Sequence, residues 1–181
     1  MNGLARLAAG DGRGGQGGGR RSKRDAVLDA AARHLNARGV SNTSLGEIAA
    51  GLGMTRAALY YYVDDREDLV FQCYRRACEA MARDLDAAGR EPGPGLERLL
   101  TFVDLALDAE RPEPAALAEV AALSSPQRET IEGLHHGNVA RLIDLIEAGQ
   151  ADGSIRPCDP LIVAQAVVGI VSWIPLAPRW T

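Results

Sequence analysis

Apolar residues recur every three or four positions along most of this chain, and short polar or Gly/Pro-containing stretches separate the periodic segments. That spacing places the apolar side chains on one face of an α-helix. It predicts eight helices and no strands, of which the first covers about 22–38. We therefore interpret the sequence as an all-α protein.

The second and third predicted helices are short and flank a glycine-containing turn. Ser44, with Glu47 three residues later, fits a capping box at the start of the second helix. Thr55 fits the N-cap of the third, which is predicted to reach about Val63. Two short helices around such a turn, with another helix before them, match the helix-turn-helix pattern. Residues 44–63 are therefore predicted to form this motif.

The remaining predicted helices are mostly longer. Asp65 fits the N-cap of one that ends near Gly89, and Pro-containing breaks at 91–95 and 110–114 follow it. Four further helices are predicted, at about 96–107, 115–123, 125–152 and 160–173. The last of these is apolar almost all round, which predicts a buried helix.

Composition agrees with packed helices, because only 4% of the residues are aromatic while 46% are hydrophobic. Cys73, Cys78 and Cys158 have no CxxC spacing and are interpreted as reduced thiols, not a disulfide frame or a zinc site. No apolar run approaches the roughly 20 residues that span a membrane, and no secretory signal is recognisable. The sequence therefore predicts a cytoplasmic protein.

The net charge of −4 is unevenly distributed. Residues 1–66 carry 10 Lys and Arg against 6 Asp and Glu, whereas residues 67–181 carry 10 against 18. A basic front and an acidic remainder indicate that only the front meets a polyanion, although chance clustering on a solvated surface is the alternative. Residues 1–21 are Gly/Arg-rich and are predicted to be disordered. Their basic end could reach DNA phosphates or be a solvated leader.

These residues resemble the TetR family of bacterial transcriptional regulators. The similarity is specific over about residues 22–81 and looser beyond them. It rests on the following residues: Val27-Leu28, Ala31, Leu35, Gly39, Thr43, Ile48-Ala49, Leu52-Gly53-Met54-Thr55, Leu59-Tyr60-Tyr61-Tyr62-Val63 and Arg66-Glu67-Asp68-Leu69. A weaker match is Gly153-Ser154-Ile155-Arg156 with Asp159-Pro160. The resemblance implies a three-helix DNA-binding domain at 22–81 and a helical effector-binding and dimerisation domain at 82–181.

Several positions depart from the family pattern. Ala57 stands where glycine is usual, Val63 where a large aromatic residue is usual, and Arg66 where lysine is usual. Asp64 and Asp65 place negative charges near the expected path of the DNA phosphates, or they cap the next helix. Members also usually add a ninth helix that dimerises with the eighth, but few residues here follow the eighth. The resemblance therefore predicts either a differently built dimer or a sequence that stops short of that helix.

A helix-turn-helix reads base edges with the N-terminal part of its second helix, which here begins at Thr55. Arg56 is the predicted base-reading residue, because its guanidinium suits the acceptor edge of guanine, while Ala57 and Ala58 let the helix sit deep. Phosphate contacts are expected from Thr43, Thr55 and Arg66, and by resemblance from Tyr60 and Tyr61. For Arg66 the alternative is a surface ion pair, and for Tyr62 packing is as plausible as a DNA contact.

The resemblance further implies a homodimer on a two-fold related DNA operator, with a repressor that a small hydrophobic effector releases. Residues expected to wall the effector pocket, each of which could equally be plain core, are Phe71, Phe102, Val103, Leu134, Leu142, Val167 and Trp173. A DNA-binding module without an effector is the alternative function. A third class, an enzyme, has no support in the sequence, which offers no nucleophile–base pair or phosphate loop. His135 and His136 are adjacent on a helix and cannot share a metal well. No metal or cofactor is predicted, and the bacterial nucleoid is the expected location.

Overall fold

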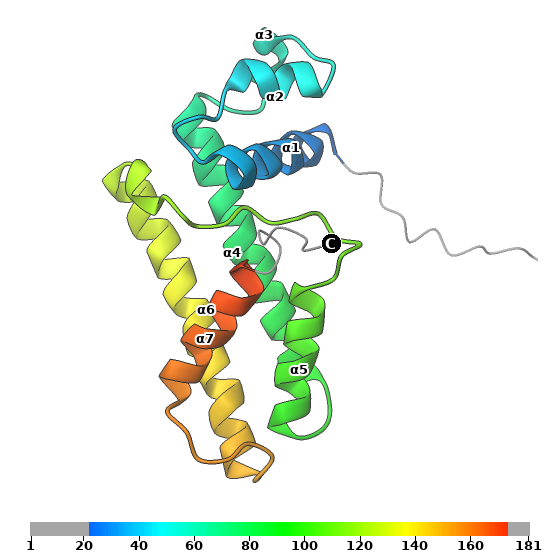
Figure 1. Cartoon of the computed structure of the whole chain (residues 1–181), viewed down its shortest axis with the longest axis vertical. Helices are drawn as coiled ribbons and strands as arrows, with labels where there is room; N and C mark the ends of the chain where they lie inside the picture. The colour runs from blue at the N-terminus through cyan, green and yellow to red at the C-terminus, as the bar shows by residue number, and fades with distance from the viewer. Residues whose placement is uncertain (1–21, 174–181) are drawn as a thin grey trace, which may run out of the picture.

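The computed structural model describes residues 22–173, which form seven α-helices and no strand (Figure 1). The expected disordered segment 1–21 and the region of a ninth helix lie outside the described residues. The helices are α1 (Lys23–Arg38), α2 (Leu45–Gly51), α3 (Arg56–Leu59), α4 (Arg66–Arg90), α5 (Gly95–Ala106), α6 (Ser125–Ala151) and α7 (Pro160–Trp173), with one 3₁₀ turn, η1 (Val120–Ala122). The prediction of an all-α protein is confirmed.

Helices α1 to α3 form a compact head on the N-terminal part of α4 (Figure 1). Ser22 caps α1 with a reciprocal capping box to Asp25, which satisfies two of the N–H groups that a helix start leaves unpaired. The centre of the head is inaccessible to solvent, since Ile48, Leu59 and Leu69 are each 0% exposed. This apolar cluster fixes α2 and α3 against α1 and α4.

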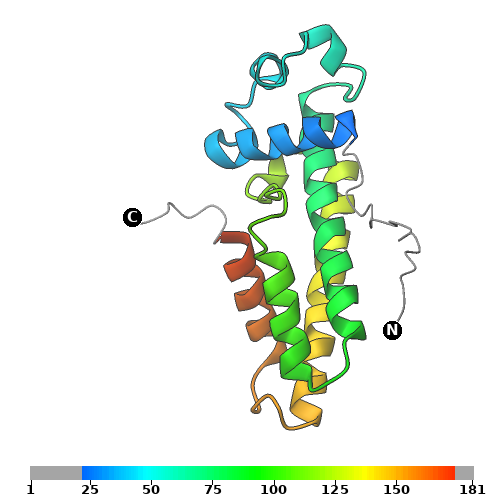
Figure 2. The same ribbon diagram turned by 90° about the vertical axis from the view of Figure 1, so that its right-hand side faces the viewer.

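Helix α4 leaves the head and continues into a body made of α5, α6 and α7 (Figures 1 and 2). A second apolar cluster lies in this body and includes Leu85 and Ala88 of α4 with Phe102, Leu142 and Ile146. Helix α5 returns beside α4, α6 packs against both, and α7 packs mainly on α6. The molecule therefore has two apolar cores. Both α4 and α6 contribute to each, since Ile131 of α6 lies in the core of the head.

The segment 107–124, called the strap below, connects α5 to α6 and crosses α4 beneath α1 (Figures 1 and 2). The prediction of an α-helix over 115–123 is wrong, because only η1 is helical there. Pro112 and Pro114 remove backbone N–H donors and disfavour helix just before them. Downstream, the N–H groups of Ala116 and Glu119 donate to Asn36 and Tyr74 of the head. Tertiary hydrogen bonds thus replace helical ones.

Two local predictions in the helix-turn-helix also need correction. Helix α3 ends at Leu59 instead of Val63, because the chain then tightens into i to i+3 hydrogen bonds such as Tyr62 N–H to Leu59 C=O. Ser44 stands at the N-cap of α2, but its side chain makes no capping hydrogen bond. The predicted caps Thr55 and Asp65 are confirmed, since their side chains accept from backbone N–H groups of α3 and α4.

The last helix is only half covered in the single chain, so the prediction of a buried helix is wrong for this chain alone. Ala164, Val168 and Val171 face inward and are buried. In contrast, Ile162 is 66% exposed and Trp173 is 67% exposed. An all-round apolar helix at the surface leaves one apolar face without a cover.

Helices α5 and α6 touch at a glycine, and this contact generates a stability prediction. A Cβ on Gly95 would lie 2.3 Å from the backbone nitrogen of Gly149, so neither helix can yield by rotating a side chain. We expect Gly95→Ala to lower the free energy of unfolding by about 1–3 kcal/mol, because the helices must separate. Thermal and urea unfolding at fixed protein concentration measure this.

Gly89→Ala is the matched control for this prediction. Gly89 is also helical, but a Cβ there meets nothing within 4 Å. Its substitution should leave the stability unchanged or raise it by up to about 1 kcal/mol, because glycine is a weak helix former. Equal stability of the Gly95→Ala protein and the unsubstituted chain would contradict the close α5–α6 contact.

Candidate nucleic-acid interface

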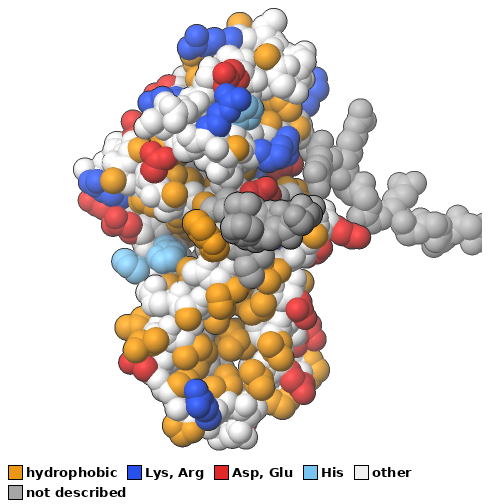
Figure 3. All heavy atoms as spheres, viewed as in Figure 1, with side chains coloured by type: hydrophobic (Ala, Val, Ile, Leu, Met, Phe, Trp, Pro, Cys, Tyr) orange, Lys and Arg blue, Asp and Glu red, His pale blue; other side chains and the backbone are white. Residues whose placement is uncertain are grey.

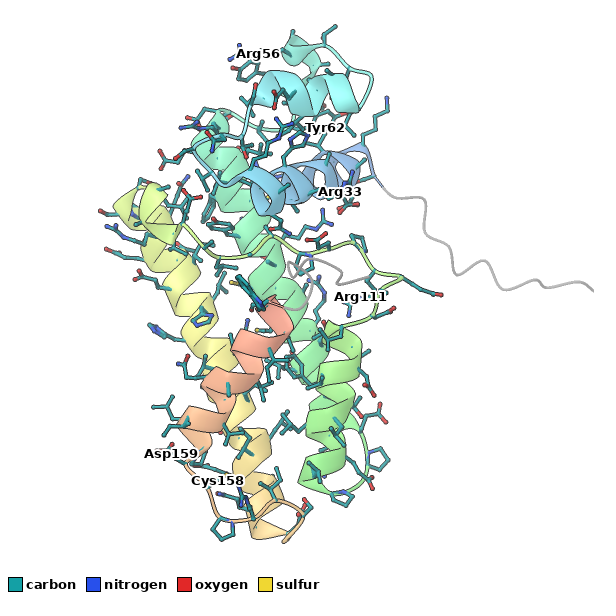
Figure 4. The ribbon with its side chains drawn as sticks, in the orientation of Figure 1. Arg33, Arg56, Tyr62, Arg111, Cys158 and Asp159 are labelled. Atoms are coloured by element: carbon teal, nitrogen blue, oxygen red, sulfur yellow. The ribbon has the colours of Figure 1, made fainter. Side chains whose placement is uncertain are left out.

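Helix α3 lies at the outer end of the head, where Arg56 is the labelled residue farthest from the body (Figure 4). Thr55 begins it, with its hydroxyl oxygen accepting from the Ala58 N–H at 3.1 Å. Leu59 points into the core and is 0% exposed, which fixes the helix's rotation. As a result Arg56, Ala57 and Ala58 are all exposed on the outer surface.

The Arg56 side chain is held in place by Tyr60, one turn later. An Nη atom of Arg56 donates to the Tyr60 hydroxyl at 3.1 Å, and the guanidinium carbon lies 5.7 Å from the centre of the tyrosine ring. Such support limits the rotamers that a long exposed side chain explores. The head therefore presents a positioned guanidinium beside two methyl groups, the chemistry that suits base edges.

The three consecutive tyrosines divide between surface and core. Tyr61 is 86% exposed and Tyr60 is 43% exposed, so both hydroxyls can reach a neighbouring molecule. Tyr62 instead packs against the apolar cluster of the head, with its ring edge-to-face to Tyr61 at 5.3 Å. For Tyr62 the packing role, left open by the sequence, is the one that its position supports.

Thr43 does not fit the predicted phosphate contact. Its side chain is only 3% exposed, and its hydroxyl donates to the carbonyl of Gly39 at 2.7 Å. The hydroxyl thus stabilises the turn after α1 instead of facing outward. The sequence prediction was wrong here because a threonine just before a helix can satisfy a preceding carbonyl as readily as it can meet a ligand.

Arg66 is exposed at the start of α4, where one Nη donates to the Ser41 carbonyl at 3.2 Å. It forms no ion pair with the neighbouring acids, because Asp65 caps α4 by accepting from the Asp68 N–H at 2.8 Å. The Asp64 N–H in turn donates to the Asp68 carboxylate at 3.0 Å. The acids near the expected phosphate path therefore serve the helix start.

The body contains a cavity of about 500 Å³, within the range of small-molecule sites. Its walls come from α4, α6, α7 and residues 105–117, which include the end of α5 and the first part of the strap. None of the residues expected to wall a pocket lines it. Phe102 and Leu142 are 0% exposed in the body core, and Trp173 is 67% exposed. Phe71, Leu134, Val103 and Val167 pack against the two apolar clusters.

A few polar groups interrupt the apolar lining. Asp84 of α4 accepts from an Nη of Arg111 on the strap at 3.0 Å, with the Asp84 side chain only 12% exposed. Arg111 projects from the strap near the upper part of α5 (Figure 4). Asn138 of α6 is 1% exposed and donates to the Cys78 carbonyl at 2.9 Å. Asp84, Arg111 and Asn138 of the lining are thus already hydrogen-bonded within the chain.

Two titratable groups of the cavity are uncharged at neutral pH. Burial, and to a smaller degree the neighbouring His136, lowers the pKa of His135 from 6.5. Burial, followed by the charge of Glu79, raises the pKa of Cys78 from 9.0 to about 11. Among residues 22–173, no three His, Cys, Asp or Glu side chains are grouped so that they could hold a metal ion. Beside these groups and the apolar wall, the lining includes the charged residues Asp84, Asp108, Arg111 and Glu113.

The sequence did not predict the cavity, because the largest apolar side chains were expected to form its walls. In the structure most of these side chains pack into the two apolar cores. The lining instead uses small residues, such as Ala77 and Ala80, that leave space. One signal was present: Asp84 and Asn138 are polar residues in register with apolar helical stripes. Buried polar groups of this kind commonly mark a site or a tertiary anchor.

Family models match most of the chain. The model described as "Bacterial regulatory proteins, tetR family" matches residues 27–73, and the model described as "Tetracyclin repressor-like, C-terminal domain" matches residues 92–180. The first covers the head and the second covers the body. Residues 74–91, which include most of α4, lie between the two matches.

Similar proteins are transcriptional regulators. An uncharacterized HTH-type transcriptional regulator of Mycobacterium tuberculosis is 30% identical over 147 residues, which are 81% of this chain and 70% of that protein. The HTH-type transcriptional repressor KstR2 of Rhodococcus jostii is 28% identical over 90% of this chain and 81% of its own. Among solved structures, AibR in complex with isovaleryl coenzyme A and operator DNA has a TM-score of 0.72 and 28% identity, covering 87% of this chain and 88% of that one.

The exposed position of Arg56 generates a prediction about sequence reading. On a duplex that the unsubstituted chain selects from random DNA, Arg56→Ala should weaken binding by about 1–3 kcal/mol and relax the preference at one base position. The reason is that alanine loses the two-pronged donor that guanine's edge accepts. Fluorescence anisotropy on the selected duplex and on single-base variants measures both effects.

Arg156→Ala removes the same charge from the connection between α6 and α7, in the body. It should leave binding and base preference unchanged at the same salt concentration. Unaltered binding by Arg56→Ala would show that another residue reads the bases.

Proposed function

The chain belongs to the TetR family of bacterial regulatory proteins, and on that premise we propose that it is a dimeric repressor that a small apolar molecule releases from its operator. The observation that carries this proposal is the presence, in one chain, of an exposed reading helix in the head and a ligand-sized cavity in the body. Helix α4 connects them. A repressor of this kind needs both features and a mechanical link.

The head supplies the DNA contacts in this proposal. Arg56 reads base edges, with Ala57 and Ala58 close to the groove floor. Thr55, Tyr60, Tyr61 and Arg66 contact phosphates, which position the head without adding sequence information. All seven side chains are exposed, whereas Thr43 is left out because its hydroxyl is engaged inside the head.

A dimer follows from the uncovered apolar face of the body. Hydrophobic side chains gather over α5 and α7 in the lower half of Figure 3. The large exposed ones on these two helices are Leu96, Leu100, Leu161, Ile162, Ile170 and Trp173. Pairing of two such faces about a two-fold axis removes them from water and presents two reading helices to a two-fold related operator. We therefore still propose α7 as the dimer interface, although one face of this helix is exposed in the single chain.

An apolar effector is proposed from the cavity and from a relative. The cavity is mainly apolar, and Asp84, Arg111 and Asn138 of its lining already have partners within the chain. AibR, which is similar in sequence and fold, was solved with isovaleryl coenzyme A and operator DNA. A ligand shifts the equilibrium only by its differential affinity for the DNA-free and DNA-bound states. Only the acyl chain of a coenzyme A thioester is apolar, so short-chain acyl coenzyme A thioesters are tested beside effectors that lack the coenzyme A part.

We also propose the division into a head at 22–81 and a body from 82 onward. The core of the head reaches Cys78 on α4, and the core of the body begins at Leu85. No helix among the described residues is long and apolar enough to cross a membrane. Because the proposed target is DNA, we propose that the protein acts in the bacterial cytoplasm at the nucleoid. No enzymatic activity is proposed.

The test combines binding and stability for the full chain on its selected duplex. The complex should contain two chains per duplex by mass. Isovaleryl coenzyme A, tested beside acetyl coenzyme A, free coenzyme A and a panel of apolar acids, should raise the Tm and release the duplex. A ligand at about one hundred times its Kd stabilises by about 2.7 kcal/mol, which a thermal shift resolves readily.

Three outcomes decide between the candidate functions. Stabilisation with release supports the ligand-responsive repressor. Tight operator binding that no member of the panel alters favours the alternative, a helix-turn-helix protein without an effector. A single chain bound per duplex would contradict the dimer.

A further inference from the structure

We infer that the strap, in addition to α4, carries the state of the cavity to the reading head, and that Asn36 and Glu119 are the positioning residues that make this connection. The inference rests on the proposed function, because it concerns how a molecule in the cavity alters DNA affinity. It depends on side-chain contacts between α1 and the strap.

Asn36, near the end of α1, binds the strap through its whole amide. Its Nδ2 donates to the Glu113 carboxylate at 2.7 Å and to the Pro114 carbonyl at 2.9 Å. Its Oδ1 accepts from the Ala116 N–H at 2.9 Å. One side chain of the head therefore satisfies backbone groups on both sides of Ala115, in a stretch that forms no helix of its own.

Glu119 makes the reciprocal contact, from the strap to the head. Its Oε1 accepts from the Val40 N–H at 2.8 Å, directly after α1 ends. Gly39 makes room for this carboxylate, because a Cβ there would lie 2.7 Å from the same oxygen. Gly39 also has φ of 76°, a conformation that other residues rarely adopt. The end of α1 is thus shaped to receive the strap.

Apolar packing adds to these hydrogen bonds. Ala115 and Leu123 of the strap are each 4% exposed and belong to the apolar cluster of the head. Leu117 and Val120 pack partly against the same cluster. The strap is therefore part of the core of the head, although in sequence it belongs to the body.

The beginning of the strap faces the cavity. Residues 107–109 and 111–117 line it, and Arg111 connects the strap to Asp84 on the opposite wall. Ala115, Ala116 and Leu117 therefore border the cavity while the same three residues contact the head. A molecule that displaces this stretch must alter its contacts with α1.

The strap can also move more readily than α4. Helix α4 is one continuous helix of 25 residues with its own hydrogen-bond ladder, so it moves as a rigid element. Strap residues 107–119 lack such a ladder and are held largely by side chains of other elements. A segment without such a ladder can shift by exchanging side-chain contacts, without the melting of a helix. The inference requires that the strap can be displaced from α1 in this way.

The experiment fills the cavity by mutation, so no effector is needed. Val171→Phe adds volume from α7, which packs on α6 and α5, and Val171 is a buried lining residue. Operator affinity of the full chain is measured for Val171→Phe, for Asn36→Ala/Glu119→Ala, and for all three changes together. Val168→Phe is a second filling variant from the same helix, and circular dichroism with sizing confirms that each protein is a folded dimer.

We expect Val171→Phe to weaken operator binding by about tenfold in the protein that keeps Asn36 and Glu119. This is a typical size for coupling between sites. The same change should weaken binding by less than about twofold when Asn36 and Glu119 are both alanine. Glu119→Gln keeps an oxygen acceptor for the Val40 N–H and should restore the tenfold response, which a role of the Glu119 charge would not predict. If the double alanine variant fails to fold, Glu119→Ala alone replaces it.

Other results overturn the inference in distinguishable ways. An equal loss of affinity in both backgrounds would mean that α4 alone carries the coupling, and the proposed function would stand. No loss from either filling variant in the unsubstituted strap would mean that the cavity does not control DNA binding. In that case the proposed ligand response fails, and the inference fails with it.

Discussion

Both apolar cores of this chain include residues of α4, the helix that carries the head. Leu69 and Cys73 of α4 lie in the core of the head, while Leu85 and Ala88 lie in the core of the body. At 1.5 Å per residue, a helix of this length is a stiff rod of about 37 Å. The rod sets the distance between the two units, but the orientation of the head also depends on what else holds it. In this chain the strap and the first turns of α6, with Ile131, provide that second support. We infer that the strap connects the cavity to the reading head.

Much of the fold could be predicted from periodicity because most of the helices obey local rules. The apolar stripes of α4, α5 and α6 and the caps Thr55 and Asp65 depend on residues close in sequence. The strap could not be predicted in this way. Residues 115–123 have helix-forming composition, but their backbone groups bond to Asn36 and Tyr74, which are far away in sequence. Tertiary contacts overrode local propensity there.

In the candidate site too, features set by nearby residues could be predicted from the sequence and features set by tertiary packing could not. The exposure of Arg56, Ala57 and Ala58 follows from a four-residue helix whose one buried residue is Leu59, so the motif alone predicted it. Thr43 and the effector pocket were mispredicted because both depend on three-dimensional packing. The largest apolar residues filled the two cores, and the cavity formed where small side chains of α4 face the irregular strap. The exposed face of α7 could not be predicted either, because an all-round apolar helix does not indicate which side other helices cover.

The most direct test of this account is amide hydrogen exchange at Val40, whose N–H is bonded to Glu119 across the boundary between head and strap. The measurement compares the unsubstituted chain with Val171→Phe, at matched pH and temperature, and reads exchange along α4 in the same experiment. The account predicts faster exchange at Val40 with little change at Cys73 and Tyr74 on α4. Unchanged exchange at Val40, together with faster exchange along α4, would contradict it.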